Sequence, residues 1–307
     1  MFKRNFFISI FFLFFFSLFA SNIKQISFNI QPLFGIINGS IEEAVYKKIG
    51  DESLYLSRLD WDVKNIPYWG ADIKITSSKY LNFEFNLIQG ISCVSGNMQD
   101  YDWADTLAPD KLTHYSCHTN TIDKFSKIRA GLSGNIFIGK YFILSPGIFM
   151  NEEYFAFTGS DGYRTYESEN WEVKYFEGDV INYKQKTENL LFALSGLFGK
   201  VDKYYGLLSF AIGPKTNIEA FDTHFKKEEL FNDKIYSCLY FESSLSGQFF
   251  FTKNFGIGGK FYIQYLPNSY GNTWFTKTEG KNWNKLSTLG ATKRLLYYAQ
   301  INASLKF

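Results

Sequence analysis

Apolar and polar residues alternate along many segments of the chain, and this alternation limits the possible fold more than any other feature. From residue 81 to 87, the odd positions hold Leu, Phe, Phe and Leu, and the even positions hold Asn, Glu and Asn. The same period recurs around 255–264 and from 297 to the final Phe307. A period of two indicates a strand with one apolar and one polar face. The polar face is too charged for a β-sandwich core, but it suits a barrel with lipid outside and a polar lumen.

Segments of this kind number about ten, an even count that fits a bacterial membrane barrel. They span residues 25–46, 54–76, 80–95, 121–138, 141–158, 181–199, 204–221, 234–251, 255–271 and 290–307.

The connections alternate between short turns and mostly longer polar loops, as in outer-membrane barrels. The turns are 77–79, 139–140, 200–203 and 252–254, and the loops are 47–53, 96–120, 159–180, 222–233 and 272–289. The sequence therefore predicts an all-β fold, a ten-stranded antiparallel transmembrane β-barrel with long extracellular loops.

The first residues have the pattern of a secretory signal. Lys3 and Arg4 precede an almost wholly apolar run that ends near Ala20. The run is shorter than the roughly 20 residues of a spanning helix, so cleavage after Ala20 is expected and an uncleaved anchor is the alternative. The predicted division is a signal peptide over 1–20 and a single barrel domain over 21–307.

Charge and aromatic content support a membrane protein and exclude a nucleic-acid partner. The formal charge of +2 falls to about zero when the two basic residues of the signal are removed, and no basic cluster appears elsewhere. Aromatic residues make up 20% of the chain. That content is expected where aromatic girdles mark both membrane interfaces.

Two acidic patterns stand out against this framework, Asp100-Tyr101-Asp102 and Asp222-Thr223-His224. In extended chain, residues i and i+2 point to the same side, so each pattern presents two polar groups together. One pattern follows the third predicted strand and the other follows the seventh. Both therefore emerge at the long-loop rim, on facing walls of a ten-stranded barrel. Three carboxylates and one imidazole brought together there could activate a water molecule.

These residues, with their neighbours, resemble the omptin family of outer-membrane endoproteases of Gram-negative bacteria. The resemblance rests on four segments in consistent order across the mature chain: Ser57–Trp61, Gly96–Trp103, Tyr183–Lys186 and Asp222–His224. It implies a ten-stranded barrel and an aspartic-type endopeptidase whose active site faces the exterior.

The resemblance also implies a role for each residue of the two patterns. Asp222 would orient His224, and His224 would be the general base for a water held between it and Asp100. Asp102 would share a proton with Asp100, because two close carboxylates resist joint ionisation. Catalytic residues are thus predicted at Asp100, Asp102, Asp222 and His224, with no covalent acyl-enzyme.

Omptins favour cleavage between basic residues, which an acidic pocket reads. Glu43 is the predicted substrate-binding carboxylate of such a pocket. A second family position, two residues before Asp222, is Ala220 here, and the adjacent Glu219 would face the other way in a regular strand. The expected preference for a basic residue before the cut is therefore weakened.

Lipid and protein partners follow from the same resemblance. Omptins commonly bind lipopolysaccharide through basic residues on the outer wall. Lys186 could occupy one such place, but the segment Asn151–Tyr154 lacks the expected Arg. The expectation is a monomer in the outer membrane, acting on peptide or protein substrates, with no cofactor unless lipopolysaccharide activates it. The alternative is a non-enzymatic barrel, an adhesin or surface-binding protein, that uses the same loops.

The cysteines leave two alternatives open. Cys93 and Cys117 flank the predicted loop that bears Asp100, so they could form a disulfide in a secreted chain or remain free thiols, while Cys238 would be unpaired. His114, Cys117 and His118 lie close in sequence, but no metal site is predicted because zinc needs three or four suitably spaced ligands.

Overall fold

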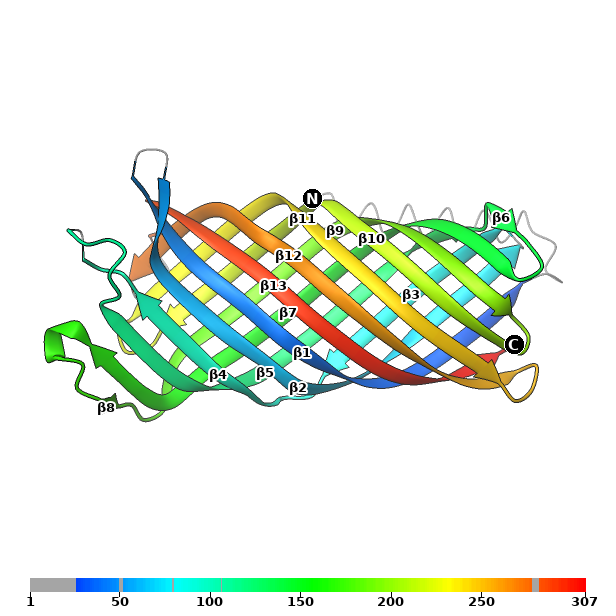
Figure 1. Ribbon diagram of the computed structural model, residues 1–307, viewed down its shortest axis with the longest axis horizontal. Helices are drawn as coiled ribbons and strands as arrows, with labels where there is room; N and C mark the ends of the chain where they lie inside the picture. The colour runs from blue at the N-terminus through cyan, green and yellow to red at the C-terminus, as the bar shows by residue number, and fades with distance from the viewer. Residues whose placement is uncertain (1–25, 50–51, 79, 106, 278–281) are drawn as a thin grey trace.

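The chain forms a closed β-barrel (Figure 1), seen here in a computed structural model that describes residues 26–49, 52–78, 80–105, 107–277 and 282–307. The predicted signal peptide over 1–20 lies outside these residues. In chain order the strands are β1 (Ser27–Ile49), β2 (Glu52–Ser78), β3 (Leu81–Gly90), β4 (Cys93–Asp102), β5 (His114–Gly134), β6 (Phe137–Ile138), β7 (Phe142–Tyr166), β8 (Lys174–Tyr175), β9 (Asp179–Lys200), β10 (Tyr204–His224), β11 (Glu229–Phe250), β12 (Phe255–Lys277) and β13 (Asn284–Lys306). Within the described residues, no helix is long and apolar enough to cross a membrane.

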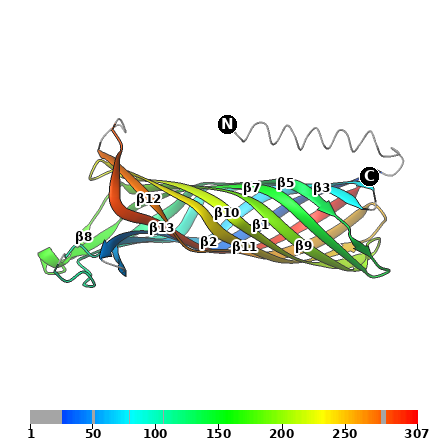
Figure 2. The ribbon, with the colours of Figure 1, turned by 90° about the horizontal axis from the view of Figure 1, so that it is seen from above.

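The barrel closes where the first strand pairs with the last. β1 and β13 are antiparallel from Asn29↔Lys306 to Tyr46↔Leu289. β3 and β4 occupy one position in the ring, interrupted at residues 91–92, because both pair with β2 and with β5. With the short β6 and β8 set aside, the described strands therefore make a ring of ten, as predicted. Seen from above, the barrel is elongated, with β8 at one end and the C-terminus at the other (Figure 2).

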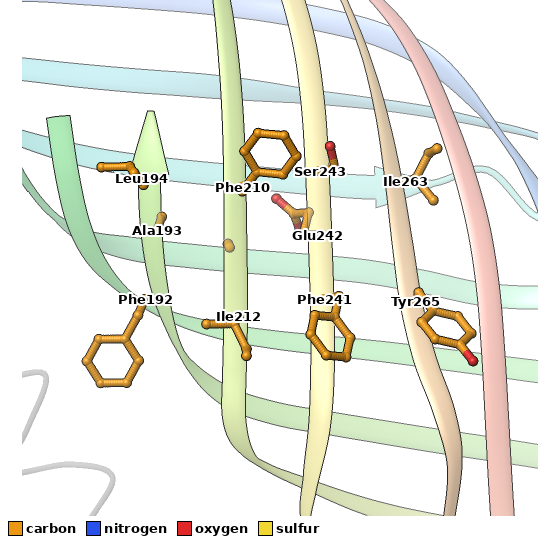
Figure 3. A pocket seen from close by; sticks show the side chains of 11 residues that line it. Phe192, Ala193, Leu194, Phe210, Ile212, Phe241, Glu242, Ser243, Ile263 and Tyr265 are labelled. Carbon is orange, nitrogen blue, oxygen red and sulfur yellow. The ribbon is translucent and has the colours of Figure 1, made fainter. Parts of the chain in front are cut away.

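A belt of exposed apolar side chains surrounds the short-turn half of the barrel. Its members include Phe34, Ile148, Phe210 and Ile257, each at least 48% exposed. The belt contains an open apolar groove of about 520 Å³ over β9 to β12, where Phe192, Phe210 and Phe241 are among the lining side chains (Figure 3). Large apolar residues facing outward at this level mark the lipid-facing wall. The groove belongs to that wall and contains none of the predicted site residues.

A buried network of charges fills the lumen inside the belt. Lys127 Nζ lies 3.3 Å from Glu153 Oε1 and 3.1 Å from Glu242 Oε2. Arg294 Nη2 lies 2.6 Å from Glu153 Oε2, and Arg129 Nη1 lies 2.6 Å from Glu242 Oε1. Each buried charge thus has an opposite charge beside it, which offsets the cost of removing it from water. Side chains occupy the lumen, as expected for a barrel of this strand number.

An aromatic layer lies between this network and the long-loop end. The fully buried indole of Trp61 on β2 stacks on Tyr183 of β9, with ring centroids 5.4 Å apart. It also stacks on Phe157 of β7, at 5.6 Å. Stacked rings of this size bury much apolar area. The layer therefore joins strands from different sides of the barrel beneath the predicted site.

The strands extend further toward the long-loop end than the sequence predicted. The predicted loops 96–120, 159–180, 222–233 and 272–289 consist largely of strand, namely β4 with the start of β5, the end of β7, the end of β10 with the start of β11, and the end of β12 with the start of β13. The apolar alternation stops where the barrel leaves the lipid belt, because water then contacts the outer face. The ladder hydrogen bonds continue, so strand structure outlasts the pattern that predicts it.

Candidate active site

Asp222 and His224 lie at the end of β10 and form a hydrogen-bonded pair. They are two positions apart in a strand, so both side chains project from the same face of the sheet. His224 Nε2 lies 2.6 Å from Asp222 Oδ2, and the two side chains are 18% and 5% exposed. The carboxylate accepts a hydrogen bond from the Nε2–H of the imidazole, which leaves Nδ1 as the nitrogen with a free lone pair.

Phe231 of β11 holds the other side of the imidazole. It is the direct cross-strand partner of Asp222, and its ring meets His224 edge-on at a centroid distance of 5.4 Å. Phe231 in turn contacts Phe275 of β12 at 5.2 Å. The imidazole is therefore fixed by a carboxylate on its own strand and by an aromatic ring on the next.

Asp100 and Asp102 lie in β4 and not in a loop after the third strand, which corrects the prediction of their setting. Asp102 is the last residue of β4, and its carbonyl oxygen accepts hydrogen bonds from the backbone N–H and the hydroxyl of Thr113. Asp100 pairs with Leu59 of β2, which pairs with Glu43 of β1. Direct partners in antiparallel strands share a face. The side chains of Glu43 and Asp100 thus enter the lumen in one row.

The two acidic pairs lie close enough to act on each other electrostatically. The part of the barrel that holds these pairs lies beyond the lipid belt, because charged side chains such as the Arg58–Asp60 ion pair cover its outer wall. Burial and the charge of Asp102 raise the pKa of Asp100 to about 7, against the opposing charges of His224 and Lys227. Burial lowers the pKa of His224, but the charge and hydrogen bond of Asp222, with Asp100, outweigh it and raise that pKa above its ordinary value.

Glu43 is buried beside these four residues, at 4% exposure. Burial raises its pKa well above the ordinary value, and the charges of Asp222, Asp233 and Asp100 raise it further. Its Oε2 atom is buried and makes no hydrogen bond. Ala220, two residues before Asp222, is buried and supplies no polar group.

Asp233 of β11 is a further acidic residue of the site that sequence reasoning missed. It is 3% exposed, and burial raises its pKa to about 7, against the opposing effect of the nearby Thr273 hydroxyl and with a smaller contribution from the charge of Asp222. Its position relative to the site depends on the register of β10 and β11. The turn between these strands fixes that register. The equal distance of Asp233 and Ala220 from the turn is therefore the only feature of the sequence that could have placed Asp233 in the site.

The other predicted features lie away from this cluster. Lys186 lies between two carboxylates, 3.1 Å from Glu152 Oε2 and 2.9 Å from Glu188 Oε1. These two carboxylates already balance the charge of Lys186, the residue that was considered for lipopolysaccharide binding. His118 is hydrogen-bonded to the Asp161 carbonyl oxygen and to the Ser116 hydroxyl.

All three cysteines are free thiols. Cys93 pairs with Ile122, whereas Cys117 pairs with Gln99. The two cysteines thus lie at different levels of the β4–β5 ladder, roughly 20 Å apart along the strands at about 3.3 Å per residue. Disulfide bonding needs Cα atoms closer than about 7 Å, so the barrel excludes the bridge considered from the sequence.

Comparison with known proteins places the whole barrel in one group. The Omptin family model matches residues 24–307. The plasminogen activator of Yersinia pestis is 21% identical over 261 residues, which cover 84% of this chain and 83% of that protein. The crystal structure of the outer membrane protease OmpT from Escherichia coli superposes with a TM-score of 0.83 at 18% identity, covering 92% of this chain and 97% of the other. The last likeness confirms the fold of the barrel.

Proposed function

The chain belongs to the omptin family of outer-membrane proteases, and on that premise we propose that it hydrolyses peptide bonds at the extracellular end of the barrel. The observation that carries the proposal is the hydrogen bond between Asp222 and His224, together with the electrostatic action of Asp100 on His224. Carboxylates that are only solvated in a loop would not be expected to make these two interactions with a histidine. An adhesin would gain nothing from a half-buried imidazole oriented by one carboxylate and facing another.

The proposed mechanism begins with a water molecule held by the Asp100 carboxylate. His224 takes a proton from this water at Nδ1, while its Nε2–H remains bonded to Asp222. The hydroxide attacks the peptide carbonyl carbon and forms a tetrahedral intermediate. The imidazolium, stabilised by Asp222, then gives its proton to the leaving amine as the C–N bond breaks.

Asp102 acts through Asp100 in this scheme. Two nearby like charges resist joint ionisation, and the charge of Asp102 raises the pKa of Asp100. A proton shared between the two carboxylates can be exchanged with the water and the intermediate during the cycle. The groups that surround the reacting atoms are carboxylates and one imidazole, so we assign the enzyme to the aspartic type of endopeptidase.

The proposed substrates are peptides or proteins with basic residues at the cleavage site. Glu43 supports this preference, because it is a buried carboxylate beside the catalytic groups with an unpartnered oxygen. A carboxylate of this kind is stabilised by a cationic side chain of the substrate more than by a neutral one. Lipopolysaccharide activation is not part of the proposal, since Lys186 is already paired with Glu152 and Glu188.

The test is cleavage of a mixed peptide library by the refolded barrel in detergent, with and without lipopolysaccharide, read by mass spectrometry. Cleavage by the wild type and its loss in His224→Ala would support the proposal. Glu219→Gln is the matched control, because Glu219 is an exposed carboxylate on the same strand that pairs with Lys234. Equal cleavage by the wild type and His224→Ala would refute the mechanism.

A further inference from the structure

Asp233 lies directly across the β10–β11 ladder from Ala220, the position where the acidic pocket expected from the sequence has no carboxylate. Direct antiparallel partners share a face, and residues two apart in a strand also share it. Asp233 therefore points into the lumen on the same side as Asp222. The cross-strand partner of Asp222 is Phe231, and Asp233 lies two residues beyond Phe231 along β11.

The carboxylate of Asp233 reaches across β12 to the backbone of β13. A Cβ atom on Gly290 would lie 2.4 Å from Cγ and Oδ1 of Asp233, so a larger residue there would have to displace the carboxylate. Two residues further along β13, Thr292 is the direct partner of Glu43. The carboxylates of Asp233 and Glu43 thus approach the same short stretch of β13 from opposite sides.

Neither carboxylate is balanced by a basic residue in the part of the chain that the structure describes. The ion pairs found there leave out Glu43 and Asp233, which are 4% and 3% exposed. Glu43 Oε2 and Asp233 Oδ1 are buried without a hydrogen-bond partner, as is Asp222 Oδ1. Buried charges are ordinarily paired, because an isolated buried carboxylate is costly. Glu43 and Asp233 therefore form an acidic pocket to which the described residues contribute no basic side chain.

We propose that Asp233 is a specificity-determining residue that binds, together with Glu43, the cationic side chain preceding the scissile bond. Asp233 supplies from β11 the carboxylate that position 220 on β10 lacks. This inference rests on the proposed peptidase function, and it names the residue through which a Lys or Arg side chain is read. The cation pairs with both carboxylates and reduces their mutual repulsion.

The experiment compares two peptides that differ only before the scissile bond, one with arginine and one with citrulline, its neutral isostere. For the wild type, kcat/KM should be much higher for the arginine peptide. Asp233→Asn should reduce the arginine-to-citrulline ratio by about thirtyfold or more, as expected when one partner of a buried charge pair is removed. Cleavage of the citrulline peptide, measured in the same assay, reports whether the variant is folded and active.

A rescue variant distinguishes a specific role from a structural one. Ala220→Asp combined with Asp233→Asn returns a carboxylate to the same cross-strand pair, so it should restore most of the preference for arginine. An unchanged arginine-to-citrulline ratio in Asp233→Asn would overturn the inference while leaving the proposed peptidase function intact. Failure of the wild type to cleave either peptide would overturn both.

Discussion

His224 Nε2 and Asp222 Oδ2 are 2.6 Å apart at the end of one strand, and only Thr223 separates the two residues in the chain. The strand geometry alone brings them to the same face. The edge-on contact with Phe231 then limits rotation of the imidazole. The orientation of the imidazole is therefore set by the β10–β11 hairpin itself.

Asp222→Asn and His224→Ala should each lower kcat by about 10²- to 10⁴-fold, the range lost with a general base or with the carboxylate that orients it. The barrel should remain folded, because neither side chain joins the lumenal charge network. Steady-state kinetics on a cleaved library peptide would measure the loss. The double variant should be little worse than the worse single one, since residues acting as a unit are not additive. Multiplicative losses would argue against a dyad.

The activity should fall as the pH falls through about 7, because the proposed mechanism needs His224 neutral and one negative charge on the Asp100–Asp102 pair. Burial and Asp102 raise the pKa of Asp100 to about 7, and the pKa of His224 is also raised. Asp102→Asn removes one of these causes, so the acidic limb of the kcat/KM profile should move to lower pH by on the order of one unit. If the acidic limb does not move, the ionisation of Asp100 does not control the rate of cleavage.

Asp233→Asn should stabilise the barrel more at pH 8 than at pH 5. In the folded chain the pKa of Asp233 is raised to about 7, whereas in the unfolded chain it is about 3.9. The folded state therefore holds more protons between these values, and the wild type loses stability as the pH rises through that window. Asparagine does not titrate, so its advantage should grow by on the order of 1–3 kcal/mol, at about 1.4 kcal/mol per pKa unit. Denaturant unfolding in vesicles at both pH values, with Glu219→Gln as control, would measure the difference.

Trp61→Ala should destabilise the barrel by about 3–5 kcal/mol, the usual cost of truncating a large buried aromatic residue. Trp61 is fully buried and stacks on both Tyr183 and Phe157. Trp61→Phe keeps a ring in the layer and should cost less. Unfolding free energies of the two variants would compare them. Equal losses would mean that a phenyl ring at this position stabilises the barrel no more than a methyl group.

All three cysteines should react with a maleimide after denaturation without reductant, giving a mass increase of three labels. Cys93 and Cys117 belong to different rungs of the β4–β5 ladder and cannot meet. Reduction should therefore leave the activity unchanged. Labelling of a single thiol per chain would contradict the register of these strands.

The sequence predicts the part of the fold that lies in lipid better than the part that carries the site. Residues such as Phe261 and Ile263 alternate with polar neighbours because the two faces of the strand meet different media. At Asp100 and Asp102 both faces meet polar surroundings, so the alternation disappears and a strand was predicted as a loop. The local spacing of Asp222 and His224 could be predicted, because it depends on one strand. The position of Asp233 could not, because it depends on the pairing of two.

The extension of the strands beyond the lipid belt has a consequence for the diversity of such enzymes. Asp100 and Asp102 near one wall, and Asp222 and His224 near the other, are carried by a continuous cylinder of backbone hydrogen bonds. The segments that join the strand ends can therefore change in length and composition while the spacing of these four side chains stays constant. Changes in these connecting segments can alter which substrates bind, while the four side chains keep their positions.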